Sequence, residues 1–183
     1  MFENVIVIGC DKTGKSTLID SLLQAPEIKG TFRYYKGEKC TTPEDAVAKA
    51  QQVMLERDVH GDPMIFDRFH FPDDFVYHPV FTGNLLPKTV VSRYFRWVFP
   101  GLKKRKTLFI YCFASPELVA DRFINEKEAL IPVEKIRDIM DNYIEVLGFL
   151  KEHFPILVLN SEYMSKGQMF DLAYRAIKEE PRQ

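Results

Sequence analysis

A short loop between a strand and a helix constrains this chain more than any other feature. Residues 9–16 read GCDKTGKS and match the pattern G-x-x-x-x-G-K-[ST]. A continuous β-branched run at residues 4–8 precedes the loop, and a helical pattern at residues 15–24 follows it. Glycines permit a tight loop whose N–H groups point at phosphate, a lysine follows, and the next hydroxyl can coordinate Mg²⁺. The segment therefore predicts a cradle for the phosphates of a nucleotide, with ATP and Mg²⁺ as the cofactors.

The remaining loop residues divide into those that face the nucleotide and one that fills space. Cys10 occupies a variable position with no histidine nearby in sequence, which favours a filler over a nucleophile. The expected nucleotide-binding residues are Gly9, Asp11, Lys12, Thr13, Gly14, Lys15, Ser16 and Thr17.

Strands and helices alternate along the chain, which predicts a parallel sheet with helices on both faces. Strands are expected at residues 4–8, 31–36, 64–66, 107–113 and 156–159, and helices at 15–24, 42–58, 88–98, 115–124, 136–150 and 169–176. This is a three-layer α/β P-loop NTPase fold with five parallel strands, expected as one domain over residues 1–183. Ligands of such sheets bind beyond the carboxyl ends of the strands.

Two segments are harder to interpret. Residues 69–87 are rich in aromatic residues and hold three prolines, so we expect a short helix and loops. Residues 103–106 are four consecutive basic residues, expected as a solvated turn and not a nucleic-acid site.

Composition excludes several classes of protein. The chain has 183 residues, 46% of them hydrophobic, and a formal net charge of -1, so no overall field favours nucleic acid or a membrane. No apolar run approaches the ~20 residues of a membrane span, and we expect no leader peptide. Three cysteines without metal-binding spacing favour a reducing, cytoplasmic setting.

The second informative motif is Asp67-Arg68, where a carboxylate ends a short buried strand beside an arginine. Phosphoryl transfer needs an acid that holds Mg²⁺ or steers the acceptor oxygen, and a guanidinium that grips acceptor phosphate with two hydrogen bonds. GTPases also need a guanine-reading N-K-x-D motif, which the sequence lacks, so this pair favours a kinase.

The two motifs together resemble the superfamily of thymidylate kinases and deoxynucleoside kinases. The closer resemblance is to phage-type, thymidylate kinase-like deoxynucleoside monophosphate kinases. In these, a DRFH segment leads into V-Y-x-P-x-(F/Y)-x-G, as residues 67–70 and 76–83 do here.

The resemblance implies roles for four residues. Asp11 would face the sugar or phosphate of the acceptor, Asp67 would serve the metal or the acceptor oxygen, and Arg68 would bind the acceptor phosphate. Arg122 would begin a lid at about residues 122–131 and contact the nucleotide.

Lys12 departs from the commonest form of the family. One subgroup places a basic residue in the phosphate loop and leaves its lid poor in arginine, and this chain resembles that subgroup. We therefore expect Lys12 to supply the cation that stabilises the transferring phosphoryl group, the alternative being a lysine that faces solvent.

Further candidates surround the acceptor. We expect substrate contacts from Phe69, His70, Tyr77, Arg93 and Tyr143. Surface charge is the alternative for Arg93, and core packing for Tyr143. The spacing of His70, Asp74 and His78 could suggest zinc, but prolines interrupt the segment and packing or base contacts fit better.

The sequence thus predicts ATP- and Mg²⁺-dependent phosphoryl transfer to a deoxynucleoside monophosphate. The alternatives are a deoxynucleoside kinase acting on a sugar hydroxyl and a non-catalytic nucleotide-binding regulator. The expected partners are small nucleotides, with neither nucleic acid nor membrane, and aromatic residues within 90–100 make a homodimer plausible.

Overall fold

Five short parallel strands form the centre of the computed structural model, which describes residues 1–126 and 131–179. The strand order is β2-β3-β1-β4-β5, so the first strand lies in the middle. The bounds are β1 Asn4–Ile8, β2 Arg33–Lys36, β3 Met64–Asp67, β4 Thr107–Phe113 and β5 Ile156–Asn160. Val7 of β1 pairs with Asp67 of β3, which places the phosphate loop beside the Asp67-Arg68 motif.

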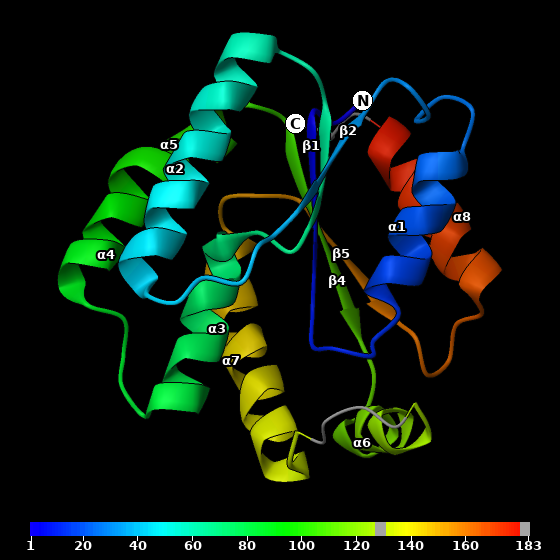
Figure 1. Ribbon diagram of the computed structural model, residues 1–183. Coiled ribbons are helices and arrows are strands. Elements are labelled where there is room, and N and C mark those ends of the chain that lie inside the picture. The colour runs from blue at the N-terminus through cyan, green and yellow to red at the C-terminus, as the bar shows by residue number, and fades with distance from the viewer. Residues whose placement is uncertain (127–130, 180–183) are drawn as a thin grey trace.

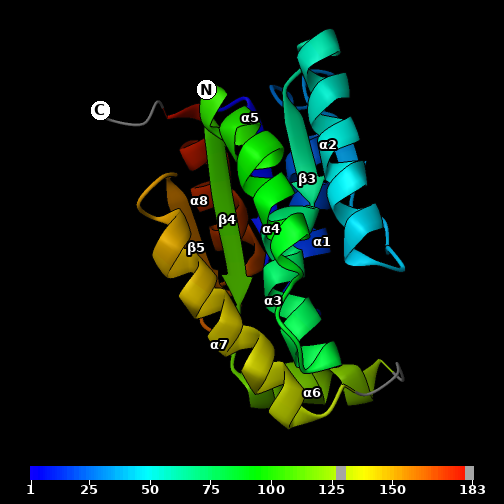
Figure 2. The same cartoon turned by 90° about the vertical axis from the view of Figure 1, so that its left-hand side faces the viewer.

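Helices cover both faces of the sheet, as Figures 1 and 2 show. On one face lie α1 Lys15–Gln24 and α8 Lys166–Lys178. On the other lie α2 Pro43–His60, α3 His70–Thr82, α4 Lys88–Arg93, η1 Tyr94–Val98, α5 Phe99–Lys104 and α7 Val133–Leu150. Helix α6, Pro116–Asn125, lies beyond the carboxyl end of β4 (Figure 1). The predicted three-layer α/β architecture is confirmed, and no helix within the described ranges has the length and apolarity to cross a bilayer.

The central strand explains how one sheet serves two cores. Val5 and Val7 of β1 pack with α1 and α8, whereas Ile6 and Ile8 pack in the cluster that includes α2, α3 and α7. Successive side chains of a strand point to opposite faces, so a strand buried on both faces reads as an unbroken apolar run. That run is what made β1 recognisable in the sequence.

Side-chain caps fix two of the predicted helix starts. The Thr42 hydroxyl accepts a hydrogen bond from the backbone N–H of Asp45 at 3.2 Å, and Ser115 accepts one from Leu118 at 3.4 Å. In each case proline occupies the first turn. These caps satisfy amide donors that have no partner inside the helix, so α2 and α6 begin where the sequence predicted.

Two local predictions need correction, and a third is not tested. Residues 70–82 form the helix α3, which is interrupted by non-helical dihedrals at Phe71. Pro72 begins its continuous part, a position that suits proline, and Pro79 lies inside it. The helix expected at 88–98 continues through η1 and α5 to Lys104, so only Arg105 and Lys106 of the basic segment connect to β4. The predicted lid at 122–131 falls partly on 127–130, outside the described residues.

Candidate functional site

A cavity of about 1270 Å³ opens at the carboxyl ends of β1 and β3. We call its two main sides the loop wall, residues 9–17, and the helix wall, residues 67–78. The loop Gly37–Thr42 between β2 and α2 and residues 161–169 after β5 complete the lining. The volume exceeds the ~300–1,000 Å³ of a typical single-ligand site, so the cavity has room for a donor and an acceptor together.

Two glycines allow backbone to come close at this cavity. A Cβ on Gly9, whose φ is 135°, would lie 2.1 Å from the carbonyl oxygen of Cys112. A Cβ on Gly37 would lie 2.9 Å from the carbonyl oxygen of Arg68. Gly9 therefore packs the loop wall against β4, and Gly37 brings the β2–α2 loop against the helix wall.

Two buried side chains of the loop wall form hydrogen bonds within the loop. The Lys15 ammonium donates to the carbonyl oxygen of Cys10 at 2.5 Å, and the Thr13 hydroxyl donates to the same oxygen at 2.7 Å. Burial lowers the pKa of Lys15, which is 5% exposed, while the charge of Asp73 opposes the shift. One carbonyl oxygen of the loop therefore accepts hydrogen bonds from both buried side chains.

Lys12 and Arg122 link the loop wall to α6. The Lys12 ammonium forms an ion pair with Glu126. The backbone of Lys12 has a positive φ of 63°. Arg122 donates to the carbonyl oxygen of Lys12 at 2.6 Å, to the Ser161 hydroxyl at 3.1 Å and to the Ser161 carbonyl at 3.2 Å. One arginine therefore ties the phosphate loop to the segment after β5.

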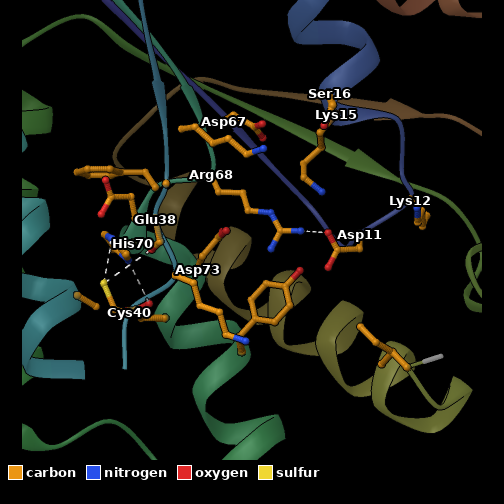
Figure 3. Close-up of a pocket in the computed structure, with 18 of the residues that line it drawn as sticks. Asp11, Lys12, Lys15, Ser16, Glu38, Cys40, Asp67, Arg68, His70 and Asp73 are labelled. Carbon is orange, nitrogen blue, oxygen red and sulfur yellow. Dashed lines mark hydrogen bonds and ion pairs between the residues drawn. The ribbon is translucent and has the colours of Figure 1, made fainter. Parts of the chain in front are cut away.

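Arg68 lies opposite the loop wall and forms an ion pair with Asp11 (Figure 3). Its φ is 61°, and within the described residues only Lys12 and Arg68 are non-glycine residues with positive φ. Such conformations are strained and gather at functional sites. The guanidinium also lies over the Tyr77 ring, with its central carbon 5.5 Å from the ring centroid. Both strained residues thus carry cations into one cavity.

Asp67 and Ser16 could hold a magnesium ion between the walls. Both line the cavity, and the buried Asp67 carboxylate accepts a hydrogen bond from Tyr34 at 3.2 Å. The described residues contain no cluster of three or more His, Cys, Asp or Glu side chains suited to a metal. Mg²⁺ fits such a sparse donor set, because it commonly takes one or two protein ligands together with water and substrate phosphate.

Asp73 is the functional candidate that the sequence did not reveal. One carboxyl oxygen accepts a hydrogen bond from Tyr143 at 2.9 Å, and the other is buried without a partner. Burial raises the pKa of Asp73 to about 6, although Arg68, the Tyr143 hydroxyl and Lys15 pull it down. Burying an oxygen that accepts no hydrogen bond costs free energy, so this oxygen is suited to an N–H or O–H of a ligand.

Most of the sequence-predicted residues meet in the cavity. Its lining includes Asp11, Lys12, Gly14, Lys15, Ser16, Thr17, Asp67, Arg68, Phe69, His70, Tyr77 and Arg122. Gly9 and Thr13 belong to the loop wall but do not line the cavity, and the fully buried Tyr143 reaches it only through its hydrogen bond to Asp73.

Arg93 does not reach the cavity. Its guanidinium instead donates to the Gln51 side chain at 2.5 Å, joining α4 to α2. A substrate contact from this residue is therefore not supported by its position. Helical spacing could place Arg93 on a face of α4 but could not tell which neighbour that face meets.

The end of β2 and the β2–α2 loop contribute side chains that the sequence gave no reason to select. Lys36, Glu38, Lys39 and Cys40 all line the cavity. No motif marks them, because their position follows from the order of strands in the sheet. The close approach of Gly37 to Arg68 adds to this, and neither the strand order nor that contact can be read from one sequence.

Comparison with known proteins gives structural neighbours but no sequence relatives. No protein-family profile matches the chain, and no curated protein matches it significantly. The YorR protein of Bacillus subtilis, solved with phosphorylated GDP, has a TM-score of 0.73 at 19% identity, covering 96% of this chain and 95% of that one. Deoxyadenosine kinase from M. mycoides with bound dATP has a TM-score of 0.65 at 19% identity, covering 97% and 100%. The same enzyme with dCMP and dCDP has a TM-score of 0.66 at 17% identity, covering 96% and 98%. The chain therefore has the three-layer fold of P-loop kinases.

Proposed function

We propose that this protein transfers the γ-phosphoryl group of ATP to a deoxynucleoside monophosphate in the presence of Mg²⁺. The observation that carries the proposal is the position of Arg68, which faces Asp11 of the phosphate loop across the cavity. An acceptor gripped by Arg68 would lie against the loop that holds the donor phosphates. Phosphoryl transfer requires this proximity, since positioning and charge stabilisation supply most of its catalysis.

The donor would occupy the loop wall. Lys15 and the loop amides would bind the β- and γ-phosphates, and Ser16 and Asp67 would hold Mg²⁺ directly or through water. The metal would neutralise charge on the phosphate oxygens. Arg122, which contacts Lys12 and Ser161, would keep the loop and the segment after β5 together around the nucleotide.

The acceptor would occupy the helix wall. Arg68 would leave Asp11 for the acceptor phosphate, and Lys36 and Lys39 line the same cavity. The unpartnered oxygen of Asp73 would accept a hydrogen bond from an N–H of the acceptor's base. Phe69, His70 and Tyr77 would complete the wall, and Lys12 would leave Glu126 to meet the transferring phosphoryl group.

A deoxynucleoside kinase is the second candidate, and the carboxylates of the cavity favour it. Asp11 already neutralises Arg68, and Glu38, Asp67 and Asp73 add negative charge beside the acceptor. A sugar hydroxyl needs a general base and no cation, and Asp67 or Glu38 could act as that base. An acceptor phosphate is anionic at pH 7 and needs cations and no base.

A panel of acceptors tests these proposals. The purified chain is incubated with ATP, Mg²⁺ and each deoxynucleoside or its monophosphate, and products are separated by ion-exchange chromatography. Diphosphate products would support the first proposal, and monophosphate products from nucleosides would replace it with the second. If ATP binds but no acceptor is phosphorylated, both enzyme proposals fail and a nucleotide-binding regulator remains.

A further inference from the structure

A thiol, an imidazole and a carboxylate lie in a row at the edge of the cavity. The Cys40 sulfur is 3.6 Å from Nε2 of His70 (Figure 3), and Nδ1 of His70 is 3.7 Å from Oδ1 of Asp74. The other Asp74 oxygen accepts a hydrogen bond from the Tyr94 hydroxyl at 2.5 Å. The row joins the β2–α2 loop, α3 and η1, and the phosphoryl transfer proposed above does not use its thiol.

The two ring nitrogens of His70 face groups of different kinds. A carboxylate on the Nδ1 side favours the tautomer that carries its hydrogen on Nδ1. Nε2 is then left with a lone pair directed at the thiol. His70 is only 7% exposed and Asp74 is held by Tyr94, so the orientation is fixed by packing. This is the arrangement of a nucleophile, a base and a group that orients the base.

Cys40 differs from the other two cysteines in access. It lines the cavity and is partly exposed, whereas Cys10 and Cys112 are 1% and 0% exposed. Burial raises the pKa of the Cys40 thiol, Lys49 opposes the shift, and the carboxylates of Asp74, Asp45 and Glu38 add to it. The resting group is therefore a neutral thiol, which needs a base at the moment of attack. His70 is the base within reach.

We propose that Cys40 is a nucleophilic thiol, activated by His70, that forms a mixed disulfide with a low-molecular-weight disulfide entering the cavity. The Cys40 sulfur attacks one sulfur of the disulfide R–S–S–R, forming the Cys40–S–S–R bond as the original S–S bond breaks. His70 takes the thiol proton at Nε2 and passes it to the departing R–S⁻, which leaves as R–SH. The exchange is balanced, because the entering disulfide is reduced by the two electrons that the new bond takes from Cys40.

The adduct would occupy the acceptor side of the cavity. Cys40 and His70 line the same cavity as Arg68 and Asp73, so a group attached to the sulfur would compete with an acceptor held there. This consequence rests on the proposed function, whereas the disulfide exchange itself does not. Cys40 would thus be a site at which thiol modification blocks the acceptor but leaves the loop wall open.

The test is the rate of exchange with oxidised glutathione, followed by intact-protein and peptide mass spectrometry on the full chain at pH 7.5. We expect one adduct, on Cys40, absent in Cys40→Ser and formed about 100-fold more slowly in His70→Gln. His78→Gln is the matched control, because His78 also lines the cavity but no contact joins it to the thiol, and its adduct should form at the wild-type rate. Equal rates in the wild type and His70→Gln would overturn the proposal.

Two measurements keep the test valid if His70→Gln does not fold. Asp74→Asn leaves the imidazole in place and should slow the exchange about tenfold, because the tautomer is no longer fixed. The wild-type thiol should also react at least about tenfold faster than N-acetylcysteine at the same pH, and a rate at or below that of the free thiol would contradict a base-assisted nucleophile.

Acceptor protection separates this proposal from the proposed function. Deoxynucleoside monophosphates should slow the exchange, and ATP alone should not. Fast, His70-dependent exchange in a chain that phosphorylates no acceptor would leave the thiol site standing and remove the kinase. Phosphorylation of an acceptor by a chain whose Cys40 does not react would support the kinase and overturn the thiol site.

Discussion

The loop wall and the helix wall of the cavity hold their charged groups in different ways. In the loop wall, the buried Lys15 and Thr13 both donate to the carbonyl oxygen of Cys10, so these two side chains have partners within the loop itself. In the helix wall, one oxygen of the buried Asp73 has no partner. The loop wall would bind phosphates, which every donor shares, whereas the helix wall would bind the part of the acceptor that varies. Side chains that are already held in place suit phosphates, which are the same in every donor. A buried acceptor atom without a partner suits the part of the acceptor that must be recognised, because only the correct ligand supplies the missing hydrogen bond.

The difference also explains which wall can be found in a sequence. A phosphate cradle is built from backbone amides, so the glycines and the lysine must stand at fixed spacing and form a motif. Asp73 acts through one side chain whose burial depends on Tyr143, seventy positions away in the sequence. No local pattern records such a contact.

Lys15→Met breaks the loop wall and has the largest expected effect. The variant removes the cation against the transferring phosphates while keeping a side chain of similar length, so turnover should fall about 10³-fold. Initial rates at saturating ATP measure it. Lys29→Met, at an exposed lysine after α1, is the control and should match the wild type. A loss smaller than tenfold would contradict the assignment of Lys15 to the donor phosphates.

Lys12→Ala tests whether the loop wall supplies a catalytic cation as well as a binding one. If the Lys12 ammonium moves from Glu126 to the phosphoryl group only during transfer, turnover should fall about 10²-fold while ATP affinity changes little. Rates combined with ATP titration by calorimetry separate the two effects. Unchanged turnover would leave Lys12 as a residue that only closes the loop against α6.

The architecture was predictable further than the site. Apolar runs marked β1, β3 and β4, and cap residues marked the starts of α2 and α6, because both signals are local. A short helix with loops was expected at residues 69–87, but α3 continues through Pro79. The hydrogen bond lost at this proline weighs less than the packing of the aromatic residues of the helix. Motifs predicted that the loop wall and Arg68 would lie at one edge of the sheet, whereas the position of the β2–α2 loop depends on the sheet order and could not be read locally.

Asp73→Asn tests whether the buried carboxylate of the helix wall lowers the stability of the fold while it serves to bind the acceptor. The pKa of about 6 lies above the ordinary 3.8, so the folded state keeps a proton that the unfolded chain releases between roughly pH 4 and pH 6. Stability is therefore lost as pH rises through that window, by about 3 kcal/mol once the pH is above 7. Asparagine does not titrate, so urea unfolding should find the variant more stable than the wild type at pH 8, with the gain vanishing near pH 4.

The same variant should bind its acceptor more weakly, because the amide nitrogen replaces an acceptor oxygen with a donor. We expect the KM for the acceptor to rise about tenfold, with ATP affinity unchanged. Asp62→Asn, at an exposed residue just before β3, is the control for both measurements. A variant with higher stability and unchanged KM would show that Asp73 does not contact the acceptor.

Tyr143→Phe sharpens the comparison with the smallest expected change. The phenylalanine ring keeps the packing, but Asp73 loses its one hydrogen-bond donor, so the ionised carboxylate becomes costlier to bury. The free energy of unfolding should fall by about 1–2 kcal/mol at pH 8 and by less near pH 5, where Asp73 is mostly protonated in the folded state. Urea unfolding at the two pH values measures the difference, with Tyr163→Phe, at a tyrosine 80% exposed, as the control.

In the Asp73→Asn background the pH dependence of the loss should disappear, because no charge remains for the hydroxyl to stabilise. An equal loss at both pH values would mean that Tyr143 supports the helix wall through its ring alone.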